Sequence, residues 1–284
     1  MYGITIRLLD REKKMKFVAE NHTFVICAYK KSEYLEECIL SLTRQTVKTN
    51  IIMVTSTPNE YINGLAAKYN IPLFLNEESI KNGSNIATDW NFALSKVTTP
   101  IATIAHQDDV YKEEYAEQIL AAMNKCEHPL IVFSDYSELR DGKEVADNKL
   151  LNVKRKLLMP LKNEHHWKSV FWRRRALSFG SPICCPAVTY YLPNLPKPIF
   201  VKGYKSDLDW EAWEKLSRLK GEFAFVNQIL MSHRIHEEST TSSLINGEGR
   251  GSEDLSMFKK FWPAPIAKMI EKKYKTSEDQ NSLK

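Results

Sequence analysis

Two adjacent aspartates, Asp108 and Asp109, stand just after an apolar run at residues 101–105. The run is typical of a buried β-strand. Adjacent carboxylates at the end of such a strand repel each other and lose water, so a cation or hydrogen-bond donors must offset the cost. In open α/β sheets, ligands bind beyond the carboxyl ends of the strands. We therefore favour a metal-assisted site, and keep open the alternative that the pair caps a helix beginning near Tyr111.

The elements that position this pair alternate between strand and helix patterns. Apolar runs typical of buried strands occupy residues 23–28, 51–55, 71–75, 101–105 and 130–134. Amphipathic helical patterns separate them, and the connections are too long for hairpins. This order predicts βαβ units and a mostly parallel sheet over residues 20–135. No GxGxxG turn follows the first strand and no GxxxxGK[ST] loop occurs, which argues against a dinucleotide fold and a P-loop NTPase.

The composition limits the partners of the chain. Its 284 residues carry a net charge of +5, with a sequence pI of about 8.8. This mild positive charge suits an anionic partner, such as a nucleotide diphosphate or an acidic membrane surface, and no nucleic-acid-binding motif accompanies it. No apolar run approaches the roughly 20 residues that span a bilayer, and the N-terminus is a poor signal peptide. The five cysteines include no CxxC pair, so we expect no disulfides, no structural zinc and a reducing cytoplasm.

The second half of the chain has a less regular pattern. Residues 140–205 mix basic, aromatic and proline-rich stretches, which we interpret as long loops forming the wall of an acceptor site. A helix is predicted at residues 207–220, ending at Gly221, and a strand at residues 223–231. One face of a lysine-rich helical pattern near the C-terminus carries Ile266, Met269, Ile270 and Tyr274. That face suits either docking on the same domain or contact with an anionic membrane.

Five segments, in this order along the chain, are similar to motifs of the family 2 glycosyltransferases. They are residues 25–29 (VICAY), Gly83 with residues 91–94 (NFAL), residues 106–109 (HQDD), residues 207–210 (DLDW) and residues 234–236 (RIH). The resemblance implies the GT-A fold, an α/β architecture with a mostly parallel, Rossmann-like sheet flanked by helices, here followed by an irregular C-terminal extension. It also implies transfer of a sugar from a nucleotide-sugar donor, assisted by Mn²⁺ or Mg²⁺.

The resemblance also suggests a domain organisation. Residues 1–21 form a lead-in, residues 22–240 a GT-A domain, and residues 241–284 a basic, amphipathic extension. Within the domain, we assign the nucleotide-sugar half to residues 22–135 and the acceptor half to residues 136–240.

The resemblance implies roles for three carboxylates and one histidine. Asp207 is the expected general base, which takes the proton of the acceptor hydroxyl; its alternative role is to cap the helix that follows. Asp108 is the expected metal ligand, and Asp109 is either a second ligand or a contact to the sugar hydroxyls. His236 is a ligand of the metal or the diphosphate, or else a structural histidine. We interpret the nearby His233 as taking no part.

Further residues are expected to contact the substrates. Those assigned to the donor are Ala28, Tyr29, Thr55, Ser56, Asn91, His106 and Asp109. Those assigned to the acceptor or the diphosphate are Asp209, Trp210 and Arg234. Tyr29 either stacks on the nucleotide base or is an ordinary aromatic residue at a strand end. Trp210 and Trp213 are three residues apart on a predicted helix, and core packing is the better interpretation for at least one of them.

Three positions depart from the family motifs. Residues 55–57 lack the acidic residue that usually ends the second strand, His106 replaces the first aspartate of the DxD region, and Ser206 replaces the glutamate before Asp207. These departures keep open a degenerate binding or scaffold protein, which would bind no nucleotide with metal. A glycoside hydrolase, which also needs two carboxylates, is the enzyme alternative.

The expected reaction is an inverting transfer, because a carboxylate base at Asp207 suits direct displacement. The expected acceptor is a glycan or a lipid-linked glycan, and no nucleic-acid partner is expected. We expect a cytoplasmic protein. Peripheral contact with the inner face of the membrane through the C-terminal segment, and formation of a homodimer, are left open.

Overall fold

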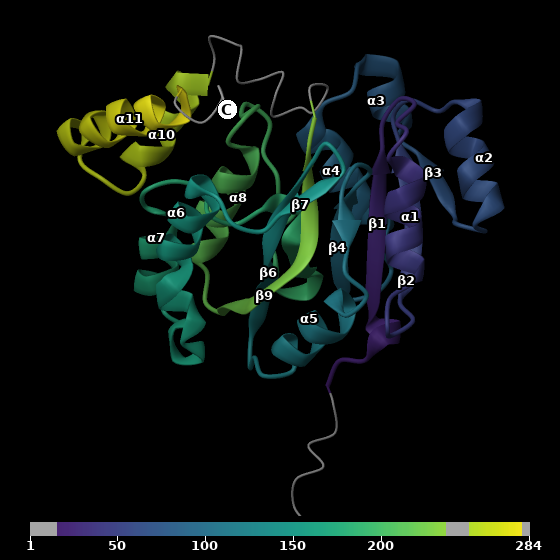
Figure 1. Cartoon of the computed structure of the whole chain (residues 1–284), viewed down its shortest axis with the longest axis horizontal. Coiled ribbons are helices and arrows are strands. Elements are labelled where there is room, and N and C mark those ends of the chain that lie inside the picture. Colours follow the sequence, from purple (N-terminus) through teal and green to yellow (C-terminus); the bar gives the residue numbers. More distant parts are fainter. Residues whose placement is uncertain (1–15, 237–249, 280–284) are drawn as a thin grey trace, which may run out of the picture.

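One half of a single β-sheet carries the predicted alternation of strands and helices. The computed structural model describes residues 16–236 and 250–279. The sheet order is β3-β2-β1-β4-β8-β6-β9-β5, with β7 paired to β6 (Figure 1). The first four strands in that order are parallel to one another: β3 (Leu73–Leu75), β2 (Asn50–Thr55), β1 (His22–Ala28) and β4 (Ile101–His106). Their carboxyl ends therefore point the same way, as the sequence predicted.

Helices connect and follow these strands. They are α1 (Leu35–Thr43), α2 (Glu60–Lys68), α3 (Glu77–Asn82), α4 (Ile86–Lys96) and α5 (Tyr115–Met123). The helices α2, α3 and α4 each begin after an asparagine whose side chain accepts a hydrogen bond from a backbone N–H in the first turn: Asn59, Asn76 and Asn85. Such caps satisfy amides that have no partner inside the helix, so they fix where each helix begins.

The other half of the sheet is mixed. It contains β8 (Val188–Tyr191), β6 (Pro129–Arg140), β9 (Glu222–Ile235), the edge strand β5 (Val110–Tyr111) and the short β7 (Lys143–Val145). Strand β8 is antiparallel to β4 and β6, β9 is parallel to β6, and β5 is antiparallel to β9. This pairing brings the end of β9 beside the loop that follows β4.

The prediction of long loops over residues 140–205 is wrong. This region contains α6 (Lys149–Leu158), α7 (Val170–Leu177) and the central strand β8. Helix α6 buries only Leu151 and Leu158, and basic residues occupy much of its remaining surface, so its apolar stripe is narrow. The predicted helix at residues 207–220 is shorter in the structure, where α8 (Leu208–Ser217) ends before Gly221.

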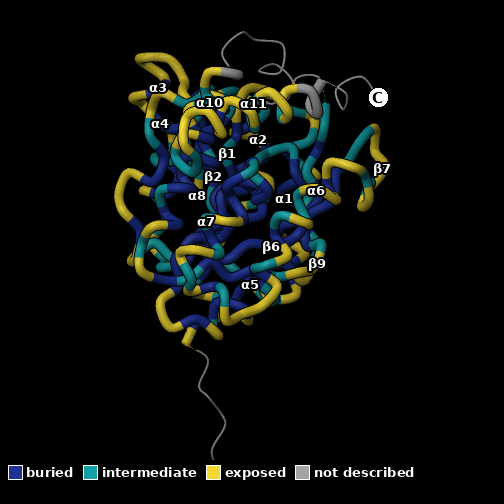
Figure 2. The backbone as a smooth tube through the Cα atoms, turned by 90° about the vertical axis from the view of Figure 1, so that its left-hand side faces the viewer, coloured by how far each residue is buried: buried dark blue, intermediate teal, exposed yellow. Residues whose placement is uncertain are grey.

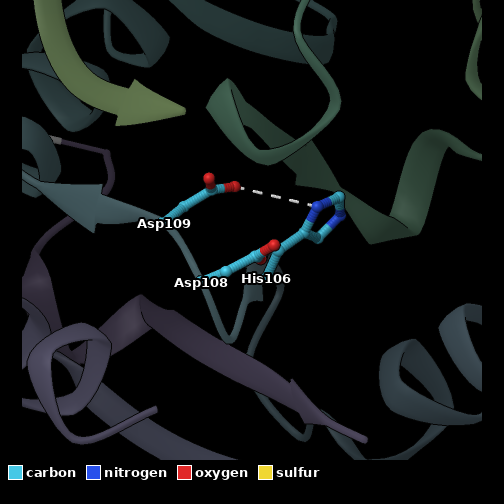
Figure 3. A group of neighbouring side chains, drawn as sticks. All are labelled: His106, Asp108 and Asp109. Atoms are coloured by element: carbon cyan, nitrogen blue, oxygen red, sulfur yellow. Dashed lines mark ion pairs between the residues drawn. The ribbon is translucent and has the colours of Figure 1, made fainter. Parts of the chain in front are cut away.

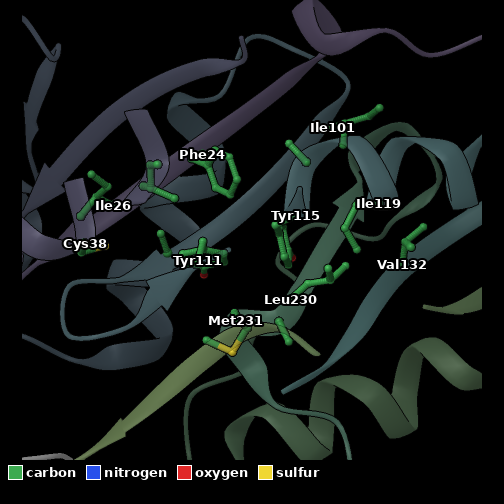
Figure 4. Packing of buried hydrophobic residues seen from close by; sticks show 14 of the residues in the cluster. Phe24, Ile26, Cys38, Ile101, Tyr111, Tyr115, Ile119, Val132, Leu230 and Met231 are labelled. Carbon is green, nitrogen blue, oxygen red and sulfur yellow. The ribbon is translucent and has the colours of Figure 1, made fainter. Parts of the chain in front are cut away.

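Both faces of the sheet are covered, so its central strands are buried on both sides (Figure 2). In β1, Phe24 and Ile26 belong to one core cluster, and Val25 between them belongs to the other. Figure 4 shows the first cluster, where side chains from β1, α1, β4, β5, α5, β6 and β9 meet. The continuous apolar run of β1 is what a strand buried on two faces requires.

Two helices end the described chain, α10 (Arg250–Lys259) and α11 (Ala264–Asp279). They lie on the side of the molecule opposite α2 and β3 (Figure 1). Phe258 is fully buried and Tyr274 packs against the same core cluster, whereas Ile266 and Met269 are exposed. The extension therefore docks on the domain through part of its apolar face, although residues 241–249 and 280–284 lie outside the described residues. Among the described helices, none is long and apolar enough to cross a membrane.

Candidate active site

The loop between β4 and β5 carries the aspartate pair, and β9 holds it in place. Asp109 is fully buried, and its Oδ1 accepts hydrogen bonds from His233 Nδ1 and from the backbone N–H of Arg234, both at 2.9 Å. The contact follows from the sheet, because Val110 pairs with Ser232. His233 is therefore part of the site, and the interpretation that it takes no part is wrong.

Asp108 is held by the end of β9 as well. Its Oδ2 lies 3.0 Å from His236 Nε2, and its backbone oxygen accepts a hydrogen bond from Arg234 Nε at 2.8 Å. Burial acts to raise the pKa of the Asp108 carboxyl, but the nearby His106 and the hydrogen bond from His236 outweigh it, so the pKa lies below its ordinary value. Asp108 is therefore anionic at neutral pH.

The alternative role of the aspartate pair as a helix cap is wrong. The helix that follows begins at Tyr115, with Glu114 at the N-cap position. Tyr111, where that helix was expected to begin, lies in β5. The two carboxylates therefore have no capping role and lie in the loop at the end of β4.

Arg234 anchors the end of β9 inside the protein. Its guanidinium donates to the Asp108 carbonyl, pairs with Glu37 of α1, and lies over the ring of Tyr34 at 4.2 Å. The residue is only 7% exposed. These contacts give no support to the predicted contact with the diphosphate, and they make Arg234 a link between α1, the aspartate loop and β9.

His106, Asp108 and Asp109 form a compact group of metal-ligating side chains (Figure 3), in which one ligand atom from each lies within 4.8 Å of the others. Within this group, His106 Nε2 and Asp109 Oδ2 are buried and have no hydrogen-bond partner among the described residues. Burial lowers the pKa of His106, although both aspartates oppose the shift, so the ring is neutral and able to bind a cation. The residues present therefore fit a divalent cation.

Helix α4 supports this group from one side. The indole of Trp90 stacks on the ring of His106, with centroids 5.1 Å apart. Asn91 uses both ends of its amide on the backbone of another segment, since Nδ2 donates to the Phe200 carbonyl at 2.7 Å and Oδ1 accepts from the N–H groups of Ile199 and Phe200. Asn91 therefore positions the chain before α8, and the prediction that it contacts the donor is not supported.

The end of β1 is tied to the aspartate loop by a glutamine that sequence reasoning missed. The backbone N–H of Tyr29 donates to Gln107 Oε1 and its carbonyl accepts from Gln107 Nε2, both at 2.9 Å. Ala28 is buried at the end of β1, whereas Tyr29 is 42% exposed. The ring of Tyr29 is therefore accessible for stacking, as the donor-binding prediction requires.

The acidic group beside the end of β2 belongs to Asp89 of helix α4. Thr55 and Ser56 are buried, and Ser56 Oγ donates to Asp89 Oδ2 at 3.0 Å. The same carboxylate accepts hydrogen bonds from Ser84 Oγ at 2.6 Å and from Asn76 Nδ2 at 2.7 Å. Asp89 thus places a negative charge beside the strand end that lacks one in sequence. Its position within an amphipathic helix pattern offered no signal for this role.

Asp207 immediately precedes α8 and is 7% exposed. It stands at the N-cap position, but its side chain accepts no hydrogen bond from the first turn of the helix, so the capping alternative is not supported. Asp209 Oδ1 accepts from the N–H of Trp210 at 2.6 Å. Trp210 is a core residue, 1% exposed, whose indole N–H donates to the Leu177 carbonyl at 3.0 Å. Its predicted contact with the acceptor or diphosphate is therefore not supported, and Trp213 is buried as well.

The pKa of the buried Cys184 thiol is raised above its ordinary value. Burial is the largest cause of the raised pKa of Cys184, and the carboxylates of Asp109 and Asp209 both add to the shift. Both charges therefore act on the same buried sulfur.

A comparison with protein-family models matches a region that contains most strands of the sheet. Residues 23–179, more than half of the chain, match the model described as glycosyl transferase family 2. A comparison with the curated proteins gave no match.

The fold is similar to solved structures at low sequence identity. TarS 1–349 of S. aureus in complex with UDP-GlcNAc has 14% identity and a TM-score of 0.59, over 88% of this chain and 70% of that chain. The mannosyltransferase PcManGT from Pyrobaculum calidifontis, in complex with GDP-Man and Mn²⁺, has 13% identity and a TM-score of 0.59, over 91% and 72%. Glucosyl-3-phosphoglycerate synthase from Mycobacterium tuberculosis, in complex with UDP, has 13% identity and a TM-score of 0.55, over 84% and 79%.

Proposed function

Because this chain belongs to glycosyltransferase family 2, we propose that it transfers a sugar from a nucleotide-sugar to a hydroxyl of a glycan or lipid-linked acceptor, with a divalent cation and with inversion. Sugar transfer itself follows from the family. The observation that carries the finer proposal is the group of His106, Asp108 and Asp109, in which one buried carboxylate oxygen has no hydrogen-bond partner among the described residues. A buried anionic oxygen in this state is costly unless a cation or ligand satisfies it.

Asp108 and Asp109 are the residues that would hold Mn²⁺ or Mg²⁺, with His106 as a further ligand. His236, 3.0 Å from Asp108, either orients that carboxylate or binds the cation itself. When bound, the cation would neutralise the leaving diphosphate. The Mn²⁺ in the complex of the Pyrobaculum calidifontis mannosyltransferase supports this proposal.

Asp207 takes the proton of the acceptor hydroxyl in the proposed reaction. As the proton moves to the carboxylate, the acceptor oxygen forms a bond to the anomeric carbon of the donor sugar. The bond between that carbon and the diphosphate oxygen breaks, and its electron pair leaves with the diphosphate. One displacement from the opposite face inverts the configuration of the carbon. Asp209, two residues along, would contact the acceptor or the diphosphate.

The donor nucleoside would lie across the ends of β1 and β2. Tyr29 offers an exposed ring for stacking, and Ser56 with Asp89 offers polar groups for the ribose or the base. Ala28 and Thr55 are buried beneath this surface. The UDP-GlcNAc and GDP-Man complexes of the structurally similar proteins support a UDP-sugar or a GDP-sugar as donor.

The acceptor is the least constrained part of the proposal. On α11, Ile266 and Met269 are exposed beside Lys268, which supports contact with an anionic lipid surface and hence a lipid-linked acceptor. A cytoplasmic location fits such an acceptor on the inner face of the membrane.

A thermal-shift titration with UDP, GDP, CMP and dTDP, each with and without Mn²⁺, tests the binding half of the proposal. A ligand that binds the native state raises its stability by mass action. We expect a Mn²⁺-dependent shift with UDP or GDP that is lost in Asp108→Ala. The absence of a shift with every nucleotide would instead support the degenerate binding protein.

Turnover tests the chemical half. It is measured as release of the nucleoside diphosphate from UDP-glucose, UDP-GlcNAc or GDP-mannose, with water in place of the acceptor. Asp207→Asn should lower this rate by roughly 100-fold or more, because a positioned base contributes at least that factor. Its nucleotide-induced thermal shift should stay at the wild-type value. An Asp207→Asn protein with wild-type turnover would refute the base assignment, and glycan cleavage without nucleotide would identify a hydrolase.

A further inference from the structure

One carboxylate from the C-terminal extension accepts hydrogen bonds from the backbone of the segment that ends at Asp207. Glu253 of α10 accepts hydrogen bonds from the N–H groups of Lys205 at 3.0 Å, Ser206 at 2.9 Å and Asp207 at 3.2 Å. The hydroxyl of Ser206 donates to the same carboxylate at 2.8 Å. Three consecutive amides therefore converge on a side chain 46 residues further along the chain.

We propose that Glu253 is a positioning residue for Asp207, and that α10 is in this way a part of the active site. The inference rests on the proposed role of Asp207 as the general base. Ser206 occupies the place of the motif glutamate before Asp207, and Glu253 brings a carboxylate to that place from α10.

Convergence of three amides restricts the backbone more than a single hydrogen bond does. Consecutive N–H groups point at one acceptor only in a narrow range of backbone angles, as in the anion-binding turns of other proteins. Burial opposes ionisation of Glu253, but the bonds from Ser206, Lys205 and Asp207 lower its pKa, so it remains charged at neutral pH. A charged acceptor makes each of these bonds stronger than a bond between neutral groups.

The Asp207 side chain does not cap α8. An aspartate at this position commonly accepts hydrogen bonds from the first-turn amides. In this protein it accepts none of them. The backbone of the segment is instead held from outside its own helix by Glu253.

Helix α10 is anchored well enough to act as a brace. Phe258 is fully buried and meets the ring of Trp210 of α8 at 5.1 Å between centroids. Lys260, just after α10, pairs with Glu211 of α8 at 3.2 Å. Ser256 Oγ lies 3.3 Å from the hydroxyl of Tyr204, at the start of the braced segment. Movement of Glu253 relative to α8 would therefore break the contacts of α10 with α8 and with Tyr204.

The test compares Glu253→Gln with Asp207→Asn in the turnover assay with water as acceptor. The glutamine has similar size, but it is uncharged and one of its two oxygens becomes an N–H₂ group that cannot accept. We expect kcat to fall by about 10- to 100-fold, the range for a catalytic group displaced by about 1 Å. We expect KM for the nucleotide-sugar to stay within about twofold, because uniform binding is unaffected. A merely structural role would change KM and the nucleotide-induced thermal shift together with kcat.

A double-mutant cycle separates the two hypotheses. If Glu253 acts through Asp207, Glu253→Gln has no further effect on kcat in the Asp207→Asn background. Additive losses would overturn the inference while leaving the base assignment intact. Wild-type turnover in Asp207→Asn would instead overturn the proposed function, whatever Glu253→Gln does.

Two further variants keep the inference testable if Glu253→Gln folds poorly. Ser206→Ala removes only one donor to Glu253 and should give a smaller loss of kcat in the same direction. The control is Glu271→Gln on α11, which removes a carboxylate that pairs with Lys275 one turn along the same helix and should leave kcat unchanged. Equal losses in Glu253→Gln and Glu271→Gln would show a general effect of charge and overturn the inference.

Discussion

His233 Nδ1 lies 2.9 Å from Oδ1 of Asp109, a carboxylate with no exposed surface. The imidazole reaches it from β9 and the carboxylate from the loop after β4, so the bond joins two parts of the sheet that are 124 residues apart in sequence. Oδ1 of Asp109 is therefore held by His233, and Oδ2 points toward His106. The geometry of the candidate metal site therefore depends on a histidine outside it.

The charge of His233 should make its contribution to stability depend on pH. Burial acts to lower the pKa of His233, but the charge of Asp109 and the hydrogen bond to it raise the pKa above its ordinary value. A raised folded-state pKa gives stability that is full below the unfolded value of about 6.5 and is lost as pH rises through the folded value. The free energy of unfolding of wild type minus that of His233→Asn should therefore be larger at pH 6 than at pH 9.

Asparagine is the chosen replacement because its amide N–H₂ can still donate to Asp109 but carries no charge. Urea titrations in the presence of a chelator measure the difference, since they exclude any effect of divalent cations on Asp109. A difference of about 1 kcal/mol between the two pH values is expected for a charge-assisted bond. Parallel pH profiles of the two proteins would show that folding does not raise the pKa of His233.

Asp109→Asn should remove cation dependence while preserving the fold. The asparagine oxygen can still accept from His233 and Arg234, but its nitrogen cannot bind a cation in place of Oδ2. For wild type, a nucleotide with Mn²⁺ at a hundredfold excess over Kd should add about 2.7 kcal/mol to the free energy of unfolding. This increment should disappear in the variant.

The matched control for Asp109→Asn is Asp147→Asn. Asp147 is exposed, and its side chain accepts from Asn152 outside the site. This variant should retain the full Mn²⁺-dependent increment in thermal or urea unfolding. Retention of the increment in Asp109→Asn as well would remove Asp109 from the metal site.

The parallel half of the sheet could be predicted because each of its elements has a local pattern. The run from Thr23 to Ala28 is long and apolar, and the helices between strands carry their own caps. Strand β5 could not be predicted in this way, because it is two residues long and exists only through pairing with β9. The ends of β6 and β9 were missed for the same reason, since Asp135 and His233 are polar residues held in strands by their neighbours.

The residues of the site also differ in whether the sequence alone could predict them. The aspartate pair follows a strand in sequence, so its location needed no tertiary information. The partner His233 and the braces Asp89 and Glu253 lie on elements whose positions only the folded chain defines. Gln107 is next to Asp108 in sequence, but its partner Tyr29 is 78 residues away. Asn91 shows the opposite error, because a motif position that suggested a ligand contact is used on the backbone of Phe200.

Gly221 should be intolerant of any side chain. Its φ is +143°, and a Cβ at this position would lie 2.7 Å from the His128 carbonyl oxygen and 2.7 Å from Leu130 Cγ. Strain and overpacking together should make Gly221→Ala less stable by about 2 kcal/mol or more. Gly64→Ala is the control, because Gly64 lies within α2 and a Cβ there meets nothing within 4 Å.

The expected sign is opposite in the control, since alanine is favoured over glycine inside a helix by about 1 kcal/mol. Midpoints of urea unfolding should therefore move down for Gly221→Ala and up for Gly64→Ala, with the slope m unchanged. Two shifts of the same sign would mean that the space around one of the glycines differs from the described packing.

His22, at the start of β1, should make the fold sensitive to acid. The ring has no exposed surface, and its Nε2 lies 2.8 Å from Thr103 Oγ1. Burial lowers the pKa of His22 to about 3. Between the unfolded value of about 6.5 and the folded value, only the unfolded chain binds the proton, so stability falls as pH falls.

This linkage costs about 1.4 kcal/mol for each pH unit well below the unfolded value, and about 2.3 kcal/mol between pH 6.5 and pH 4.5. His22→Gln cannot take up the proton, so the free energy of unfolding of wild type minus that of the variant should shrink by about that amount over the same interval. His165→Gln, which alters an exposed histidine on the surface, should leave the wild-type pH dependence unchanged. Equal acid sensitivity of wild type and His22→Gln would mean that the His22 site admits water and stabilises the charged ring.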